Sequence, residues 1–404
     1  MNKAYSKALE TTTKIERLLW KIDNSHNAPV IIFIGGIHGN EPAGVFALQN
    51  AKEKLKPQTE KIKGAVYAFS GNLKGLSKNQ RYVDKDLNRL WTKESLQNIL
   101  AKKEEEELVS EEKELIELYH QIKSILDTHT GPFYFVDFHT TSSKTLPFIT
   151  INDALINRKF SRQIPVPVVL GIEEYLEGPL LSYINSLGYV SLGFESGQHD
   201  EVAAIENSEA FIFLTLVFAG CMKEEDIPNI KKYYERLKIA SEGKAVPFEV
   251  IYRYLIKPHE LFKMKEGFKS FQPIKKRTLL AISNNEPVQA KQKGELFMPL
   301  YQQKGKDGFF IIKRIPSFFL WLSALLRDIK ADYILALLPG ISWESPKREA
   351  LIVNIKIARF LTKQIFHLLG YRNKQINDTY VRMNNRERVA KKKMYHQTSW
   401  FKKS

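Results

Sequence analysis

The sequence predicts an α/β fold in which a β-sheet is covered by helices on both faces. Between about residues 30 and 240, short runs rich in β-branched and aromatic residues alternate with amphipathic or charged segments. The chain also has 404 residues, which is too long for one ordinary core and indicates two or three domains. We therefore expect a catalytic or binding α/β domain with smaller domains attached to it.

Five apolar runs are the expected strands of the sheet: residues 30–36, 64–71, 133–140, 167–172 and 189–197. An amphipathic helix is expected over 42–55, because Pro42 suits a first helical turn. Residues 93–126 carry apolar residues at helical spacing, which predicts one or two surface helices with their charge run as a solvated face. The apolar run 210–222 is shorter than the roughly 20 residues that span a bilayer, and we expect a buried helix there.

The composition of the chain changes near residue 246. Beyond it, short strand-like runs are separated by Gly, Pro and Asn turns, which predicts a small β domain over 247–316. Residues 317–338 and 349–370 are amphipathic with a helical period, so the sequence predicts a helical, basic extension over 317–404. The first domain is then 1–246.

The charge and the cysteine content of the chain limit which partners and which metal ligands are expected. The net charge is +16, and residues 317–404 supply 17 Lys and Arg against 6 Asp and Glu. Such a basic region is compatible with nucleic acid or an anionic membrane surface, but its Leu, Ile and Phe at helical spacing favour a packed subdomain with a basic exterior. The N-terminus lacks the apolar core of a signal peptide, so we expect a cytoplasmic protein without a transmembrane segment. Cys221 is the single cysteine, so any metal must be bound by His, Asp or Glu.

The segment GGIHGNEPAG, residues 35–44, is the first candidate site. His38 and Glu41 follow an expected buried strand, at the edge where open α/β sheets bind their ligands. An imidazole and a carboxylate three residues apart can converge on one zinc ion, and His139, at the end of another expected strand, is the best third ligand. Asp137 could then orient a ligand. An HxxE pair alone is more often two unrelated polar residues, but a second strand-end histidine favours the metal site.

Glu195 ends a further apolar strand in YVSLGFESG and is the candidate general base. Partial burial would raise its pKa toward the working range, while the alternative is a strand-end carboxylate without a task. His199 and Asp200 follow in a loop, where exposure to solvent is the simpler interpretation.

A loop of alternating charge, NQRYVDKDLNRLW over residues 79–91, is the third candidate segment. A guanidinium suits a substrate carboxylate, and a second one could polarise a carbonyl group and hold its oxyanion. A surface loop tied by Arg–Asp pairs explains the same residues equally well.

The four segments GGIHGNEPAG, RYVDKDLNR, DFHTTSS and GFESG, in this order, resemble the succinylglutamate desuccinylase and aspartoacylase family. The resemblance covers about residues 30–200, and the small β domain is similar to the C-terminal domain of that family. It implies a zinc-carboxypeptidase-like mixed β-sheet flanked by helices. It also implies that His38, Glu41 and His139 bind one Zn²⁺ ion and that Glu195 activates the metal-bound water.

The resemblance further implies how the substrate is held. Arg81 would polarise the amide carbonyl and stabilise the oxyanion, and Asn88 and Arg89 would bind a substrate carboxylate. Tyr301 lies in a segment that the family brings near the pocket, so it is a further expected substrate contact. One departure is that residues 181–195 contain no arginine ahead of Glu195, where aspartoacylases use another basic residue, so the sequence does not indicate plain N-acetylaspartate specificity.

The implied reaction is hydrolysis of the amide bond of an N-acyl amino acid of the aspartate or glutamate type. A zinc carboxypeptidase-like peptidase is the alternative for the same metal site. Binding of nucleic acid or an anionic surface through residues 317–404 is the alternative of a different class. The substrate is expected to be a small molecule, and the sequence leaves open the acyl group and whether the chain forms a homo-oligomer.

Overall fold

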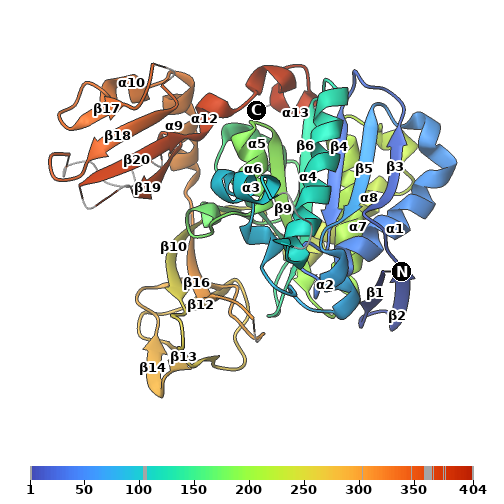
Figure 1. Ribbon diagram of the computed structural model, residues 1–404, viewed down its shortest axis with the longest axis horizontal. Helices are drawn as coiled ribbons and strands as arrows, with labels where there is room; N and C mark the ends of the chain where they lie inside the picture. The colour runs from blue at the N-terminus through green and yellow to red at the C-terminus, as the bar shows by residue number, and fades with distance from the viewer. Residues whose placement is uncertain are drawn as a thin grey trace.

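The computed structural model describes residues 2–402, except 103–106, 303, 347, 359–365, 367, 376 and 378. Its main feature is an eleven-stranded mixed sheet with helices on both faces (Figure 1). The strands lie in the order β12 (Gln272–Ile274), β15 (Gly294–Phe297), β16 (Asp307–Arg314), β10 (Pro247–Leu255), β8 (Val168–Leu170), β7 (Phe148–Ile151), β9 (Val190–Gln198), β6 (Phe133–Thr141), β4 (Val30–Gly35), β5 (Ala65–Ser70) and β3 (Leu18–Asp23). The predicted mixed sheet flanked by helices is confirmed.

Both faces of the central strands are buried, which explains their nearly continuous apolar sequences. Along β4, Ile31 and Phe33 join one apolar cluster while Ile32 and Ile34 join another. Helices α1 (Ala43–Leu55), α5 (Leu155–Ser161) and α7 (Val202–Phe218) contribute to the first cluster, and α8 (Ile230–Ala240) packs on α7. Helices α3 (Lys93–Leu100), α4 (Ser110–Thr128) and α6 (Leu180–Ser186) contribute to the second. The predicted helix over 42–55 and the predicted buried helix at 210–222 correspond to α1 and α7.

The charged residues within α4 differ from their prediction as a solvated face, while residues 103–106 lie outside the described part of the chain. Glu111, Glu112 and Glu114 are at most 8% exposed. Each of these carboxylates is buried because it has partners on other segments. Glu114 pairs with Arg17, and Glu112 pairs with Lys85 at 2.9 Å. Helical periodicity identifies the face of a helix but not the partners that a folded chain brings to it.

The region 247–316 contributes strands to the central sheet and also forms a smaller sheet of its own. Strand β10 pairs in parallel with β8 and antiparallel with β16, which in turn pairs with β15. A separate three-stranded sheet follows, made of β11 (Phe262–Met264), β13 (Leu279–Ser283) and β14 (Glu286–Gln289). In Figure 1 this region extends away from the α/β body, and the division at residues 246 and 316 remains our proposal for the domain limits. A short N-terminal hairpin, β1 (Lys3–Ser6) with β2 (Thr11–Lys14), and α2 (Leu73–Lys78) complete the body.

The sequence predicted a helical extension over 317–404. The structure shows that this region also contains a four-stranded sheet. Its sheet has the order β17 (Ile341–Trp343), β18 (Ala350–Asn354), β20 (Tyr380–Asn385) and β19 (Tyr371–Gln375), beside α9 (Ser317–Asp328) and α10 (Asp332–Leu335). The predicted helix over 349–370 is wrong at β18, where Leu351 and Val353 face the apolar cluster of the extension. A short apolar run fits a strand and a helix equally well, so its period could not decide between them. Residues 359–365 and 367 lie outside the described part of the chain.

The chain end returns to the α/β body through α12 (Arg386–Val389) and α13 (Ser399–Lys402) (Figure 1). Tyr395 is fully buried, and its hydroxyl donates to the carbonyl of Phe133 at 2.6 Å and accepts from the amide of Val190 at 2.9 Å. Trp400 is 1% exposed and its ring lies 5.2 Å from that of Phe160. Tyr395 and Trp400 therefore belong to the core of the α/β body.

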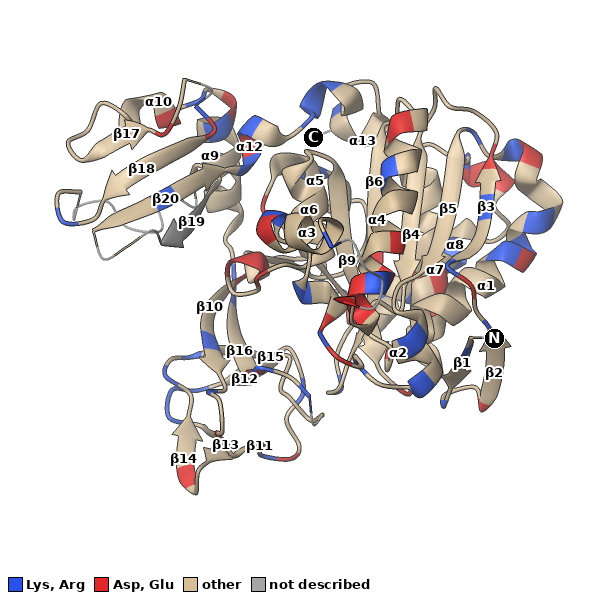
Figure 2. Cartoon of the chain, in the orientation of Figure 1, with Lys and Arg blue, Asp and Glu red and all other residues tan. Residues whose placement is uncertain are grey.

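Buried ion pairs join the extension to the body. Arg327 contacts Asp153 at 2.8 Å, Arg158 contacts the same carboxylate at 2.7 Å, and Arg386 contacts Glu173 at 2.7 Å. Burial opposes ionisation of Asp153, but the surrounding guanidinium groups hold its pKa well below the usual range. Figure 2 shows acidic and basic segments around α12, where these pairs form. A share of the basic charge of the extension is thus neutralised internally.

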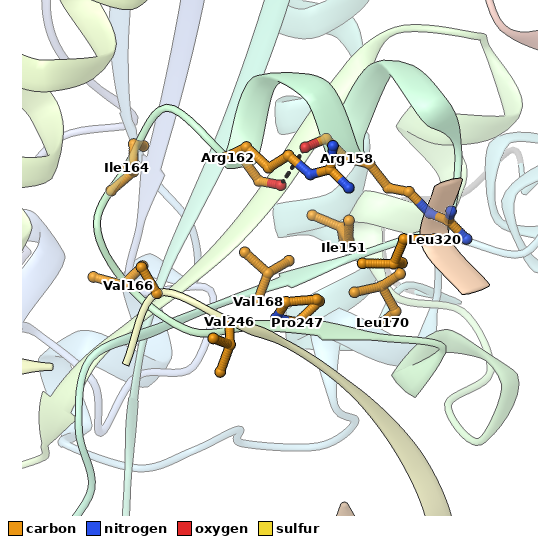
Figure 3. Close-up of a pocket in the computed structure, with 12 residues that line it drawn as sticks. Ile151, Arg158, Arg162, Ile164, Val166, Val168, Leu170, Val246, Pro247 and Leu320 are labelled. Carbon is orange, nitrogen blue, oxygen red and sulfur yellow. Dashed lines mark hydrogen bonds between the residues drawn. The ribbon is translucent and has the colours of Figure 1, made fainter. Parts of the chain in front are cut away.

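A small cavity of about 70 Å³ lies at this junction (Figure 3). Apolar side chains line it, among them Ile151, Val168 and Leu320, together with Arg158. Its volume is far below the roughly 300–1,000 Å³ of a small-molecule pocket, and none of its lining residues is a candidate site residue. Among the described residues, no helix is long and apolar enough to cross a membrane.

Truncating Trp400 tests whether this C-terminal segment stabilises the α/β body. Trp400→Ala is expected to lower the free energy of unfolding by about 3–5 kcal/mol, because the change leaves a cavity between α13 and α5. Urea unfolding followed by circular dichroism measures it. The control Phe318→Ala, at a side chain that is 61% exposed, is expected to change stability by no more than about 0.5 kcal/mol. Equal unfolding midpoints for Trp400→Ala and wild type would contradict the packing described here.

Candidate metal and hydrolase site

Three side chains that sequence reasoning selected as metal ligands converge at the carboxyl ends of β4 and β6. Nδ1 of His38 lies 3.0 Å from one oxygen of Glu41, and Nδ1 of His139 lies 3.0 Å from the other. One ligand atom from each of the three residues lies within 4.8 Å of the other two. All three side chains are buried, with exposed fractions of 2–8%. The donor set, two imidazole nitrogens and one carboxylate, suits a zinc ion with room for a further ligand.

The local backbone explains why these residues meet. Strand β4 pairs in parallel with β6, so their carboxyl ends lie at one edge of the sheet. After β4 the chain turns at Gly36, whose φ of +70° favours glycine. Gly39 passes so close to Gly75 that an added Cβ would lie 1.9 Å from the Gly75 carbonyl carbon. The glycines of this segment therefore permit a tight turn that points His38 and Glu41 back over the strand ends.

Carboxylates behind the histidines fix the orientation of both rings. Nε2 of His139 lies 2.8 Å from Asp137, and Nε2 of His38 lies 3.2 Å from Asp86. A ligand histidine commonly donates its other ring N–H to such a carboxylate, which leaves the opposite nitrogen free for a metal. The contact with Asp86 was missed by sequence reasoning. The signal that could have found it is the acidic pair in DKD, within a loop already suspected of facing the site.

The electrostatics of the cluster follow from this burial and pairing. Burial opposes the charge of Glu41, but His38 and His139 hold its pKa well below the usual range. Burial also opposes protonation of His139, whereas Asp137 and Glu41 raise its pKa well above the usual value. The carboxylate of Glu41 therefore stays ionised and attracts positive charge to the centre of the cluster.

Glu195 lies directly beside the cluster, because it is the Cα partner of His139 in the pairing of β6 with β9. Its side chain is 7% exposed, and Oε2 has no hydrogen-bond partner in the described part of the chain. Burial raises the pKa of Glu195 to about 8. A cation bound to the neighbouring residues would favour the ionised form and lower that pKa. A buried carboxylate with an unpaired oxygen is suited to exchange protons with a molecule held at the cluster.

Arg81 contacts two members of the same cluster. Its guanidinium contacts Asp86 at 3.2 Å, Nε2 of His38 at 2.9 Å and Glu41 at 3.5 Å. Burial disfavours its charge, but Asp86 and Glu41 raise the pKa of Arg81 above its ordinary value. A permanent positive charge with several N–H donors therefore faces the site.

Asn88 and Arg89 follow in the same loop but have different surroundings. Oδ1 of Asn88 accepts from the amide of Leu180 at 2.8 Å, so this side chain also ties the loop to the start of α6. Arg89 donates from Nη1 to the carbonyl of Asn88 at 2.7 Å. Burial lowers the pKa of Arg89 from its ordinary value, as expected for a guanidinium with few partners.

Tyr301, the fourth expected substrate contact, is engaged within its own region. Its hydroxyl lies 2.8 Å from the carbonyl of Lys265 and 3.1 Å from the amide of Phe268. The next residue, Gln302, instead reaches the site, where its amide oxygen accepts from Asn40 at 3.1 Å and lies 3.3 Å from His199. Tyr301 therefore stays a prediction, while Gln302 is a rim residue that no sequence pattern marked.

His199 is less exposed than its loop position indicated. Its Nδ1 lies 2.7 Å from the hydroxyl of Thr140, and burial lowers its pKa. His199 thereby links the end of β6 to Gln302 and the region 247–316. Lys304 supports the same link by donating to the carbonyl of Tyr82 at 2.9 Å.

Glu111 holds the loop that carries Arg81, Asp86 and Asn88. Its fully buried carboxylate accepts from the backbone amides of Val83, Asp84 and Lys85 at 2.7–3.0 Å. It also accepts from the side chain of Asn72 at 3.0 Å. Sequence reasoning missed this residue because the EEEELVSEEKE run resembles an ordinary solvated helix face.

Comparison with known proteins identifies this arrangement. The family model of the succinylglutamate desuccinylase/aspartoacylase catalytic domain matches residues 27–209. Residues 27–209 are therefore similar to the catalytic domain of this family. All the candidate metal, base and arginine positions described above lie within the matched residues.

Curated relatives in this family are similar over part of the chain. A probable aspartoacylase of Acaryochloris marina is 25% identical over 176 residues, which cover 41% of this chain and 55% of that protein. A probable aspartoacylase of Nostoc sp. is 35% identical over 68 residues, which cover 17% of this chain and 23% of the relative. The chain thus spans about half the length, or less, of these relatives.

Solved structures show the same fold at low identity. The succinylglutamate desuccinylase/aspartoacylase from Rhodobacter sphaeroides has a TM-score of 0.52 and 15% identity, covering 78% of this chain and 94% of that chain. The ectoine utilization protein EutE from Ruegeria pomeroyi, in a product-bound structure, has a TM-score of 0.52 and 18% identity, covering 73% and 88%. Since identity is low, these likenesses concern the fold.

Replacing Glu111 tests its role in holding the site loop. Glu111→Ala removes the acceptor for three backbone amides, so hydrogen exchange in residues 79–91 is expected to accelerate at least about 10-fold, as loss of 1.5–3 kcal/mol of hydrogen bonding implies. Hydrogen–deuterium exchange with mass spectrometry measures it. Glu117→Ala, at a half-exposed residue on the same helix, is the control. Unchanged protection of residues 79–91 in Glu111→Ala would contradict the role.

Proposed function

We propose that this protein is a zinc-dependent amidohydrolase that cleaves an N-acyl amino acid into a carboxylic acid and a free amino acid. The observation that carries the proposal is the convergence of His38, Glu41 and His139 beside Glu195, in a domain of the desuccinylase/aspartoacylase family. The likeness to relatives named aspartoacylase supports an N-acyl-aspartate or N-acyl-glutamate type of substrate.

His38, Glu41 and His139 would hold the zinc ion, and Asp86 and Asp137 would keep both imidazole rings oriented. The fit rests on the donor set and on the unpaired oxygen of Glu195 beside it. When bound, zinc supplies a Lewis acid that makes water acidic enough to lose a proton near neutral pH.

The other residues of the site would carry the proton and the charge of the reaction. Glu195, as the general base, takes a proton from the attacking water and delivers it to the nitrogen of the leaving amino acid. Arg81 donates to the oxygen of the scissile carbonyl, where negative charge develops when the amide carbon becomes tetrahedral. Its contacts with Asp86 and Glu41 hold the guanidinium in position before substrate arrives.

Substrate recognition would use the loop that follows Arg81. Arg89 has one hydrogen bond in the described part of the chain, from Nη1, so its remaining N–H groups are available for a carboxylate. Asn88 offers its Nδ2 group, because its Oδ1 is already engaged by Leu180. The carboxylates of N-acyl-aspartate or N-acyl-glutamate match these donors. Tyr301 could contact substrate only if its hydroxyl exchanged its present backbone partners.

A carboxypeptidase-like reaction is chemically open to the same site, but the family match favours N-acyl amino acids. Binding of nucleic acid through the extension is not favoured either, because Arg327, Arg386 and Arg388 are paired with carboxylates. The cytoplasm remains the expected location, and a homo-oligomer remains compatible with this function.

Neutralising Glu195 tests the proposed base. Glu195→Gln keeps the size of the side chain but cannot accept the proton, so kcat is expected to fall on the order of 10²–10⁴-fold. Bound zinc, measured by elemental analysis, is expected to stay at the wild-type level. Glu53→Gln, at an exposed position on α1, is the control and should leave kcat unchanged. Wild-type kcat in Glu195→Gln would refute the assigned role.

A substrate panel with metal depletion tests the reaction class. Protein treated with a chelator and reloaded with zinc is assayed for free amine released from N-acetylaspartate, N-acetylglutamate, N-succinylglutamate and two short peptides. Turnover of at least one N-acyl amino acid is expected, lost without zinc and in His38→Ala, because that variant lacks one of the three ligands. Turnover confined to the peptides would establish the carboxypeptidase alternative instead.

A further inference from the structure

A second group of potential metal ligands lies at the opposite end of the sheet from the hydrolase site. It consists of Asp23, His26 and His129, whose ligand atoms lie within 4.8 Å of one another. Asp23 pairs with Ala65 at the start of β5, whereas Ser70 at the end of β5 pairs with Gly35, next to the turn that carries His38. At about 3.3 Å per residue, the two groups are separated by on the order of 15–20 Å along the strands.

The contacts within this group resemble those of a formed metal site. Oδ1 of Asp23 lies 3.1 Å from Nε2 of His129 and 3.8 Å from Nε2 of His26. Nδ1 of His129 lies 3.1 Å from the carbonyl of Ile125. Because a carbonyl only accepts, Nδ1 donates its proton to Ile125, and Nε2 faces Oδ1 of Asp23, where a bound metal would replace the Nε2 proton. One carboxylate, of Asp23, and one imidazole, of His129, are thus already oriented for a metal.

Surrounding residues hold each ligand in place. The hydroxyl of Tyr67 donates to Oδ2 of Asp23 at 2.7 Å, which leaves Oδ1 toward the histidines. The amide of Thr130, next to His129, donates to the carbonyl of His26 at 2.9 Å. The rings of His26 and His129 lie 4.7 Å apart at 61°, an edge-on arrangement in which neither stacks flat on the other. His129 is buried, while the side chain of His26 is 58% exposed and open to a metal from solvent.

We propose that Asp23, His26 and His129 form a second, peripheral site for a divalent transition metal of the zinc or cobalt type. Two imidazole nitrogens and one carboxylate oxygen are borderline ligands that select such ions over magnesium or calcium, and solvent supplies the remaining coordination. The bound ion ties the end of β3 to the connection between α4 and β6. The site is independent of the proposed hydrolysis, because none of its ligands contributes to the His38 cluster.

Cobalt binding tests the proposal on the full chain. Equilibrium dialysis with Co²⁺ and visible absorption spectroscopy are applied to wild type, His26→Ala, Asp23→Asn, His38→Ala and the control His120→Ala. His120 is an exposed histidine on α4 outside both groups. His26→Ala is expected to bind one Co²⁺ fewer per chain than wild type, and His120→Ala the same number. Asp23→Asn is expected to bind the peripheral ion at least about 10-fold more weakly.

The His38→Ala variant separates this site from the first one. It is expected to retain the Co²⁺ that His26→Ala loses, so failure of the hydrolase site and failure of the peripheral site give different results. Equal Co²⁺ stoichiometry and affinity in wild type and His26→Ala would overturn the proposal. Wild-type Co²⁺ affinity in Asp23→Asn would also overturn it, because the ion would then not be bound by the Asp23 carboxylate. Circular dichroism of each variant checks that the fold is intact.

Discussion

The parallel pairing of β4, β6 and β9 is the constraint on which the rest of the molecule depends. Parallel strands end at one edge of the sheet, so residues more than 100 positions apart in sequence, such as His38 and Glu195, reach the same site. The same pairing buries both faces of the strands. Electrostatic interactions between charged groups are stronger in such a buried site than in water. This explains how Glu41 is held ionised while the nearby Glu195 has a raised pKa.

The site is supported by residues that do not touch the proposed zinc ligands. Glu111 on α4 binds the backbone of the loop that carries Arg81, and Gln302 reaches the rim from the region 247–316. The edge that carries the candidate site is therefore assembled from segments within and after the matched residues 27–209. A carboxylate accepting several backbone amides is a rigid support, because each bond constrains the loop in a different direction.

The extension is built into the protein through charge and through its last residues. Arg327 and Arg386 neutralise buried carboxylates of the body, while Tyr395 and Trp400 enter its core. Its positive charge is thus partly a structural feature. Removing one member of such a buried pair leaves an uncompensated charge, which is why these contacts couple the extension to the body more strongly than surface ion pairs would.

The sequence by itself determined the α/β class, the strands that carry the site and the identity of its metal and base candidates. Local patterns were sufficient there, because a buried strand followed by glycines and a polar residue predicts a ligand-binding turn at the carboxyl edge of the sheet. Tertiary structure alone decided which of the remaining residues are buried and which side chains they contact. The run around Glu111 became a buried support, β18 became a strand, and Asp23 met His129 across 106 positions. In each case, the deciding contact comes from a distant segment, which no local pattern contains.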